Sequence, residues 1–303
     1  MALNMAEAPA KVILLGEHFC VHGASALSVA VNLYARVRVE AKPAVGLQVL
    51  GLEGFPSLVE AVKLGVQAVF QRAGKPLPSL EVRVSSEIPI GAGLGSSASI
   101  AAAAIAATLR LAGLTPSKDL VMDLCSIPER LIHGNPSGVD QATVILGGLI
   151  FFKRGEAWKL NPQPLSLVVG DTGERRSTGR LVERFGSLLA KKRGEYLAEA
   201  EELTLQALKA LKEGNLEGLG EAMNKAQKLL SKFQLSTPKL DRLVEAALKG
   251  GALGAKLTGA GGGGCMVALT RPGEAGRVAE ALRRAGGKPY MVEVDWEGLK
   301  VKP

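Results

Sequence analysis

The chain has 303 residues, which suffices for one large domain or for two domains that share a cleft. A hydrophobic content of 47% excludes a mainly disordered chain, and no apolar run approaches the roughly 20 residues that span a membrane. The net charge of +8 suits a ligand that carries phosphate and also suits an RNA surface, although an aromatic content of 4% weakens the case for stacking on single strands.

The N-terminal residues and the cysteines indicate the compartment. Residues 1–10 lack the basic segment and the apolar core of a secretory signal. Cys20, Cys125 and Cys265 are too few and too widely spaced for a disulfide framework or a zinc site. We therefore expect a cytoplasmic protein without a membrane-spanning segment.

Residues 8–23 form the first segment that suggests chemistry. Residues 12–15 are typical of a short buried strand, and Lys11 stands directly before them. Glu17 and His18 follow at a turn. An ammonium, a carboxylate and an imidazole this close to a buried strand each cost desolvation unless they are paired or bound to a ligand. A surface turn with a chance Glu–His pair is the alternative.

The next two segments indicate architecture. Residues 33–41 alternate apolar and polar side chains, as in a half-exposed antiparallel strand. Ser57 and Glu60 predict a capping box at the start of a helix that Gly74 ends.

A glycine-rich stretch, 88–99, lies between a strand predicted over 80–84 and an alanine-rich helix predicted over 98–111. Its alternating glycines allow close backbone approach, and the first amides of the helix point outward beside the hydroxyls of Ser96 and Ser97. Such a loop can hold phosphate. It lacks the lysine of a Walker A loop and the third glycine of a dinucleotide fingerprint. An ordinary glycine-rich turn is the alternative.

Two carboxylates flank a predicted turn further along. Thr115-Pro116 predicts the start of a helix, which Pro128 kinks or restarts before Glu129. Residues 135–138 form a turn, so Asp140 lies in the first turn of a short helix. An aspartate at a helix start often serves only as a cap or dipole partner, and that alternative stays open.

The remaining chain predicts further strands and helices around two loops. Strands are expected over 147–153, 157–160, 165–170 and 290–294, and helices over most of 179–250 and over 272–286. The loop 170–178 carries arginines and hydroxyls that could meet an anion, although such loops are mostly solvated. A second glycine run, 259–264, lies between two short apolar segments and must pass close to another part of the chain.

Three segments resemble, in the same order, the three motifs of the GHMP small-molecule kinases. They are Lys11-Val-Ile-Leu-Leu-Gly-Glu-His18, Pro89-Ile-Gly-Ala-Gly-Leu-Gly-Ser-Ser-Ala98 and Lys256-Leu-Thr-Gly-Ala-Gly-Gly-Gly-Gly-Cys265. Within that family, the run from Glu129 to Asp140 is similar to the mevalonate kinases. The resemblance covers nearly the whole chain. It implies an α+β fold of two domains with the active site between them: an N-terminal nucleotide-binding domain of ribosomal-protein-like topology, 1–165, and a C-terminal domain, 166–303.

The resemblance also implies residue roles. Asp140 would accept the proton of the attacking hydroxyl, and Lys11 would pair with Asp140 and stabilise the transferring phosphoryl group. Ser97 and Glu129 would hold Mg²⁺. The ATP phosphates would be bound by Gly91, Ala92, Gly93, Leu94, Gly95, Ser96 and Ser97. The substrate would be oriented by Glu17, His18, Thr178, Arg176, Gly259 and Ala260.

The implied activity is phosphorylation of the primary hydroxyl of mevalonate by ATP, with no nucleic-acid partner and a homodimer as one option. Three alternatives stay open: another GHMP kinase, acting on phosphomevalonate or homoserine; a basic RNA-binding protein without activity; and a ligand sensor. Pro128 departs from the glycine that commonly precedes the metal-binding glutamate, and residues 233–236 match the family poorly. No motif identifies the adenine pocket.

Overall fold

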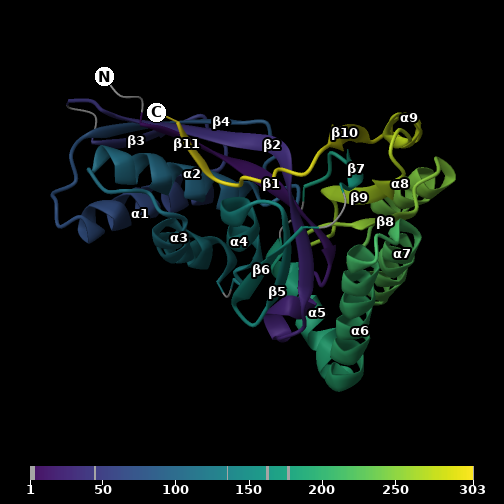
Figure 1. The fold of residues 1–303 in the computed structure, drawn as a ribbon. Helices are drawn as coiled ribbons and strands as arrows, with labels where there is room; N and C mark the ends of the chain where they lie inside the picture. Colours follow the sequence, from purple (N-terminus) through teal and green to yellow (C-terminus); the bar gives the residue numbers. More distant parts are fainter. Residues whose placement is uncertain (1–3, 44–45, 135, 162–163, 176–177, 303) are drawn as a thin grey trace.

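Two units, each a β-sheet with helices packed against it, lie side by side (Figure 1). The structure is a computed structural model that describes residues 4–43, 46–134, 136–161, 164–175 and 178–302, without the side chains of residues 178–184. The predicted α+β class is confirmed. Among the described residues, no helix has both the length and the apolar character needed to cross a membrane.

The first sheet has the strand order β11-β1-β2-β4-β3, and β5 joins it through β2 and pairs in turn with β6. These strands are β1 (Met5–Leu15), β2 (Ala26–Ala41), β3 (Leu47–Leu50), β4 (Leu80–Ser86), β5 (Leu149–Lys153), β6 (Glu156–Leu160) and β11 (Lys300–Lys302). Only the β3–β4 ladder is parallel among the described strands of this sheet. The first half of β2 is buried on both faces and the second half alternates, so periodicity predicted only the second half.

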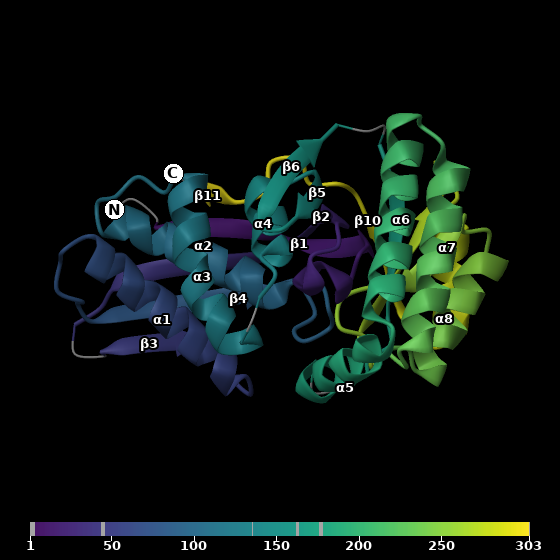
Figure 2. The ribbon, with the colours of Figure 1, turned by 90° about the horizontal axis from the view of Figure 1, so that it is seen from below.

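Helices cover one face of this sheet (Figures 1 and 2). They are α1 (Pro56–Arg72), α2 (Ser96–Leu111), α3 (Lys118–His133) and α4 (Val139–Leu146), and a single 3-10 turn, η1 (Phe19–His22), follows β1. Residues 98–109 of α2 are all buried. Their small alanine side chains let the helix lie close against β1 and β2 while α1, α3 and α4 cover its other sides.

The second sheet is antiparallel, with the order β10-β7-β9-β8. Its strands are β7 (Ser166–Asp171), β8 (Gly254–Leu257), β9 (Cys265–Thr270) and β10 (Lys288–Val292), and the helices of this unit are α5 (Thr178–Lys191), α6 (Arg193–Lys212), α7 (Leu216–Lys232), α8 (Pro238–Lys249) and α9 (Ala275–Arg284). Thr237 caps α8 by accepting from the amide of Leu240 at 3.2 Å, as its sequence with Pro238 indicates.

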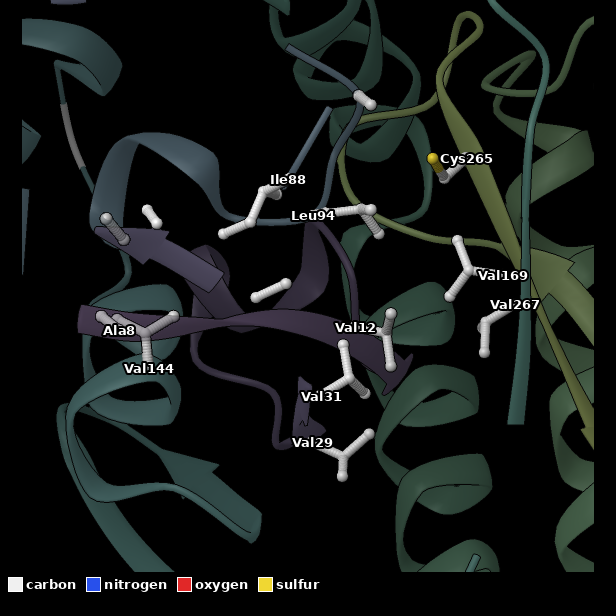
Figure 3. Packing of buried hydrophobic residues seen from close by; sticks show 14 of the residues in the cluster. Ala8, Val12, Val29, Val31, Ile88, Leu94, Val144, Val169, Cys265 and Val267 are labelled. Atoms are coloured by element: carbon white, nitrogen blue, oxygen red, sulfur yellow. The ribbon is translucent and has the colours of Figure 1, made fainter. Parts of the chain in front are cut away.

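The two units share one hydrophobic core. Figure 3 shows Val12 and Val31 of the first sheet in the same cluster as Val169 and Val267 of the second. The end of the chain also crosses back, because β11 pairs with β1 after an isolated bridge between Val31 and Val294. Residues beyond the second sheet therefore complete the first one, although a boundary at 165/166 assigns them to the second domain.

Several predicted element ends are wrong. The strand predicted over 12–15 begins at Met5, because residues 6–10 are buried on both faces and show no alternation. The predicted capping box fails, since Phe55 is the N-cap of α1 and makes no side-chain cap bond. The helix α3 starts after its N-cap Ser117, whose hydroxyl accepts a hydrogen bond from the amide of Leu120. It then runs through Pro128 to His133.

The C-terminal part of the chain differs in similar ways. The last helix begins at Ala275 instead of Pro272, and its neighbouring strand covers 288–292 instead of 290–294. The three-residue strand β11 was not predicted, because it is too short to show a period.

Candidate active site

The loop between β4 and α2 presents backbone amides to a cleft. Gly91, Gly93 and Gly95 have positive φ angles of 71°, 87° and 73°, and Gly95 is the N-cap of α2. Within the described part of the chain, the amides of residues 92–98 have no protein acceptor, and the amide of Gly91 lies 3.4 Å from Ser96 Oγ. The loop therefore offers the free donors that an anion needs at a helix N-terminus.

Lys11 and Asp140 meet beside this loop. Lys11 Nζ lies 3.0 Å from Asp140 Oδ1, and the lysine is only 2% exposed. The amide of Lys11 donates to Leu94 O at 3.0 Å, which places the β1 strand directly against the glycine loop. A Cβ on Gly95 would lie 2.8 Å from Lys11 Cγ, so only glycine leaves room for the lysine stem. The N-cap of α4 is Gly138, so Asp140 pairs with Lys11 instead of capping the helix.

Glu129, on α3, is a buried carboxylate that lacks a full set of partners. Its Oε1 atom has no hydrogen-bond partner among the described residues. Burial, and then the negative charge of Asp140, raise the pKa of Glu129 to about 8, while Lys11 and a hydrogen bond with Ser97 act in the opposite direction. His133 Nε2 lies 3.7 Å from Glu129 Oε2 and 3.5 Å from Ser97 Oγ, and burial lowers the pKa of that imidazole.

The second glycine run closes the opposite side of the cleft. A Cβ on Gly93 would lie 2.6 Å from Thr258 O, and a Cβ on Gly259 would lie 2.6 Å from Gly93 Cα. The amide of Cys265 donates to Ala92 O at 2.9 Å. The backbones of the two loops thus pack directly against each other across the two units. A side chain on either loop would clash with the other, so both loops carry glycine at this contact.

The cleft has a cavity volume of about 130 Å³ and opens to solvent. It is lined by Lys11, Gly91, Ala92, Gly93, Gly95, Ser96, Ser97, His133, Asp140, Thr258, Gly259, Ala260, Gly261, Gly263 and Gly264. The structure thus brings residues of all three motifs and the Asp140 segment to one place. Of the predicted phosphate-binding residues, Leu94 points its side chain into the core and offers only its backbone.

Glu17 and His18 lie behind the cleft wall. Glu17 is buried in an ion pair with Lys256 and does not line the cleft, so its predicted contact with a substrate has no support in this placement. His18 Nε2 lies 3.0 Å from Ala260 O, and its ring stacks on Phe185 with centroids 4.9 Å apart. Burial lowers the pKa of His18 to about 4, so the ring is neutral near pH 7.

The loop after β7 is described up to Arg175. Arg176 lies outside the described residues, and Thr178 begins α5 with a side chain that is also outside the description. The guanidinium of Arg175 donates to both carboxylate oxygens of Asp171, at 2.9 and 2.8 Å, and its Nε donates to Ile90 O at 3.0 Å. Arg175 therefore ties the second sheet to the glycine loop.

Sequence reasoning missed three residues at this site. His133 follows Glu129 by one helical turn, and that spacing was the available signal. Thr258 lines the cleft and accepts from the amide of Ile13 at 2.8 Å, a contact between distant segments that no local pattern indicates. Arg175 stands in a loop whose arginines were considered only as solvated groups or anion contacts.

Comparisons with known proteins agree with this geometry. The model of the GHMP kinase N-terminal domain matches residues 58–148, and the model of the GHMP kinase C-terminal domain matches residues 207–288. The chain belongs to the GHMP kinase family. Mevalonate kinases of Pyrococcus furiosus and Thermococcus gammatolerans are each 37% identical to it, with 98% of both chains covered.

Solved structures show the same similarity. The mevalonate kinase of L. major in complex with R-mevalonate has a TM-score of 0.84 and 28% identity, covering 97% of this chain and 96% of that one. The Methanococcus jannaschii mevalonate kinase has a TM-score of 0.82 and 28% identity, covering 96% of this chain and 98% of that one.

Proposed function

We propose that this protein transfers the γ-phosphoryl group of ATP to the primary hydroxyl of mevalonate, giving 5-phosphomevalonate and ADP for isoprenoid biosynthesis. The observation that carries the proposal is the Lys11–Asp140 pair, at 3.0 Å, in a cleft walled by free loop amides. The relatives named mevalonate kinase, one of them solved with R-mevalonate, identify the acceptor.

Each residue of the pair has a task in the transfer. The carboxylate of Asp140 accepts the proton as the substrate oxygen bonds to the γ-phosphorus and the bond from that phosphorus to the β–γ bridging oxygen breaks. The ammonium of Lys11 stabilises negative charge on the transferring group, and the backbone of residues 91–97 holds the phosphates. Because no covalent enzyme intermediate is needed, positioning and charge supply most of the acceleration.

The residues present fit a magnesium ion. Glu129 Oε1 is buried without a hydrogen-bond partner among the residues that the structure describes, and Ser97 hydrogen-bonds the same carboxylate. Mg²⁺ takes few protein ligands and fills its other positions with phosphate and water oxygens, so one carboxylate and one hydroxyl suit it. Ser97 and Glu129 would hold Mg²⁺, which when bound neutralises charge on the ATP phosphates.

The proposal includes roles that come from the family resemblance. Substrate would be oriented by Arg176 and Thr178, by Gly259 and Ala260, which line the cleft, and by His18 through its contact with Ala260 O at 3.0 Å. We also propose a cytoplasmic enzyme with domains near 1–165 and 166–303. A homodimer is one option for its assembly, which light scattering of the purified protein would test.

A panel of acceptors tests the proposal. The purified protein is supplied with ATP and Mg²⁺ and with mevalonate, phosphomevalonate or homoserine, and ADP release is measured for each. We expect mevalonate to have the largest kcat/KM. Faster turnover of either other acceptor would reject the proposed substrate while leaving the kinase family assignment intact.

A further inference from the structure

A buried pair of charges joins the first and third motifs behind the cleft. Glu17 follows β1, and Lys256 lies on β8 in the other unit. The two residues form an ion pair, and their side chains are 1% and 0% exposed. The second oxygen of Glu17, Oε2, has no hydrogen-bond partner among the described residues. Lys256 is therefore the main group that compensates the negative charge of Glu17, with smaller contributions from a backbone hydrogen bond and from Lys11.

The same lysine fixes the neighbouring backbone. Lys256 Nζ also donates to Leu257 O at 2.7 Å and lies 3.5 Å from Ile13 O, while the amide of Ile13 donates to Thr258 Oγ1 at 2.8 Å. Ile13 is two residues from Lys11 on β1, and Thr258 begins the loop that lines the cleft. The position of Lys256 thus sets the spacing between the strand that carries Lys11 and the glycine loop opposite.

Fold stability alone does not explain why Glu17 and Lys256 are buried as a charged pair. A buried ion pair seldom stabilises a fold more than apolar side chains of the same size would, whereas the loss of one partner leaves a buried charge without compensation. Burial raises the pKa of Glu17 and lowers that of Lys256, and Lys11 acts electrostatically on both groups. Lys256 Nζ lies 3.5 Å from the carbonyl of Ile13, two residues from Lys11 on β1. Glu17 therefore neutralises a second ammonium beside the strand that carries Lys11 and thereby favours the place of Lys11 beside Asp140.

We propose that Glu17 is a positioning residue that acts through Lys256, holding the third-motif loop against β1 and screening Lys11, and that it does not contact the substrate. This inference rests on the proposed function and revises one substrate contact implied by the family resemblance. The pair is buried and off the cleft, so its effect reaches the reaction through the Thr258 loop and through Lys11.

A double-mutant cycle tests the proposal. Glu17→Gln, Lys256→Met and the double variant are compared with the wild type for kcat, for KM of mevalonate and for thermal unfolding. We expect each single variant to lose at least about tenfold in kcat and the double variant to recover much of that loss, because no uncompensated charge remains. A direct substrate contact predicts instead that Glu17→Gln raises KM for mevalonate equally with and without Lys256, and this result would overturn the proposal.

Two further variants keep the test decisive. Glu17→Asp retains the charge and should fold even if the other single variants do not; its shorter side chain should lower kcat about threefold or more with KM for mevalonate unchanged. Glu201→Gln is the matched control, since Glu201 pairs with Lys153 across the two units at 2.7 Å but lies off the cleft. It should lower thermal stability and leave both kinetic constants within about twofold.

Two outcomes separate the inference from the function it rests on. If Glu17→Asp loses thermal stability but keeps wild-type kinetic constants, the pair is structural only and the proposal fails. If the wild type does not turn over mevalonate at all, the proposed function fails. The double-mutant cycle is then measured by the affinity for a non-hydrolysable ATP analogue. Additive effects of Glu17→Gln and Lys256→Met on that affinity would show that the two residues are not coupled and would overturn the inference.

Discussion

The two glycine loops of this protein, residues 88–99 and 259–264, have similar sequences but differ in what their backbone amides bond to. In the first loop, the amides of residues 92–98 have no protein acceptor in the described structure, and most of these residues line the cleft. In the second loop, Gly262 donates to Leu235 O at 2.7 Å and Gly264 donates to Glu174 O at 2.9 Å. One loop keeps its donors for a ligand, while the other uses alternate donors to hold itself in place.

The difference arises from the secondary structure into which each loop leads. The first loop runs into the N-terminus of α2, where the helix geometry itself leaves amides unpaired and adds a favourable dipole for an anion. The second loop connects two antiparallel strands, so its backbone is free to bond neighbouring segments. Glycine content alone therefore does not identify a phosphate site, and the element after the loop decides.

The strongest test separates phosphate binding by the first loop from proton removal by Asp140. Asp140→Asn keeps the size of the side chain but removes the base, so turnover should fall by at least about 100-fold, within the range for a general base. The affinity for ATP should change little, because the loop amides remain in place. Steady-state turnover and calorimetric ATP binding measure the two effects, and a near-normal rate would show that Asp140 is not the base.

A glycine of the first loop gives the next largest effect. Gly95→Ala would place a Cβ 2.8 Å from Lys11 Cγ and should lower kcat/KM for ATP by roughly 10- to 100-fold, since Lys11 or the loop must shift. Gly74→Ala is a matched control, since Gly74 has a φ of 63° against 73° for Gly95, and an added Cβ would have no atom of the described residues within 4 Å. Equal losses in the two variants would mean that backbone strain, and not the contact with Lys11, causes the defect.

Gly264→Ala extends this test to the second loop. Its Cβ would lie 2.6 Å from Ala92 O, where the two units pack. We expect a lower thermal unfolding temperature, while the variant should bind ATP once folded. A kinetic defect as large as that of Gly95→Ala, without a loss of stability, would contradict the division of tasks between the loops.

The pH dependence of magnesium affinity tests the role of Glu129. Its pKa of about 8 means that the free enzyme carries a protonated carboxyl below that pH, and a cation must displace the proton to bind. The apparent affinity for Mg²⁺ should therefore rise about tenfold per pH unit below about pH 7, rise about fivefold between pH 7 and pH 8, and level off above about pH 9. Glu129→Gln should weaken the affinity about tenfold or more at pH 9 and remove the pH dependence. A slope that persists in this variant would assign the proton to another group.

Sequence patterns predicted the parts of the site that are local. The glycine loop before α2 and the place of Asp140 in the first turn of α4 follow from glycine content, periodicity and turn chemistry, whereas Lys11 lies within β1 and not before a strand. The partner of Glu17 could not be predicted from the sequence. A buried charge needs an opposite charge beside it, and only the tertiary fold determines that this charge is Lys256 from the other unit. The strand β11 was missed because its three residues show no period, and its partner strand lies at the other end of the chain.

The smallest expected effect concerns the link between the first loop and the second sheet. Arg175 holds Ile90 O at 3.0 Å while Asp171 fixes its guanidinium with two bonds, but the arginine is partly exposed, so the link is worth no more than about 1 kcal/mol. Arg175→Met should raise KM for ATP up to about fivefold and leave kcat unchanged, because the variant loosens the edge of the loop without touching Lys11 or Asp140. Asp171→Asn is the matching variant, and it should have the same effect if Asp171 acts only by orienting the guanidinium. A large fall in kcat with either change would show that Arg175 acts on the transferring phosphoryl group itself, and the first loop would then not be the sole phosphate-holding element of the cleft.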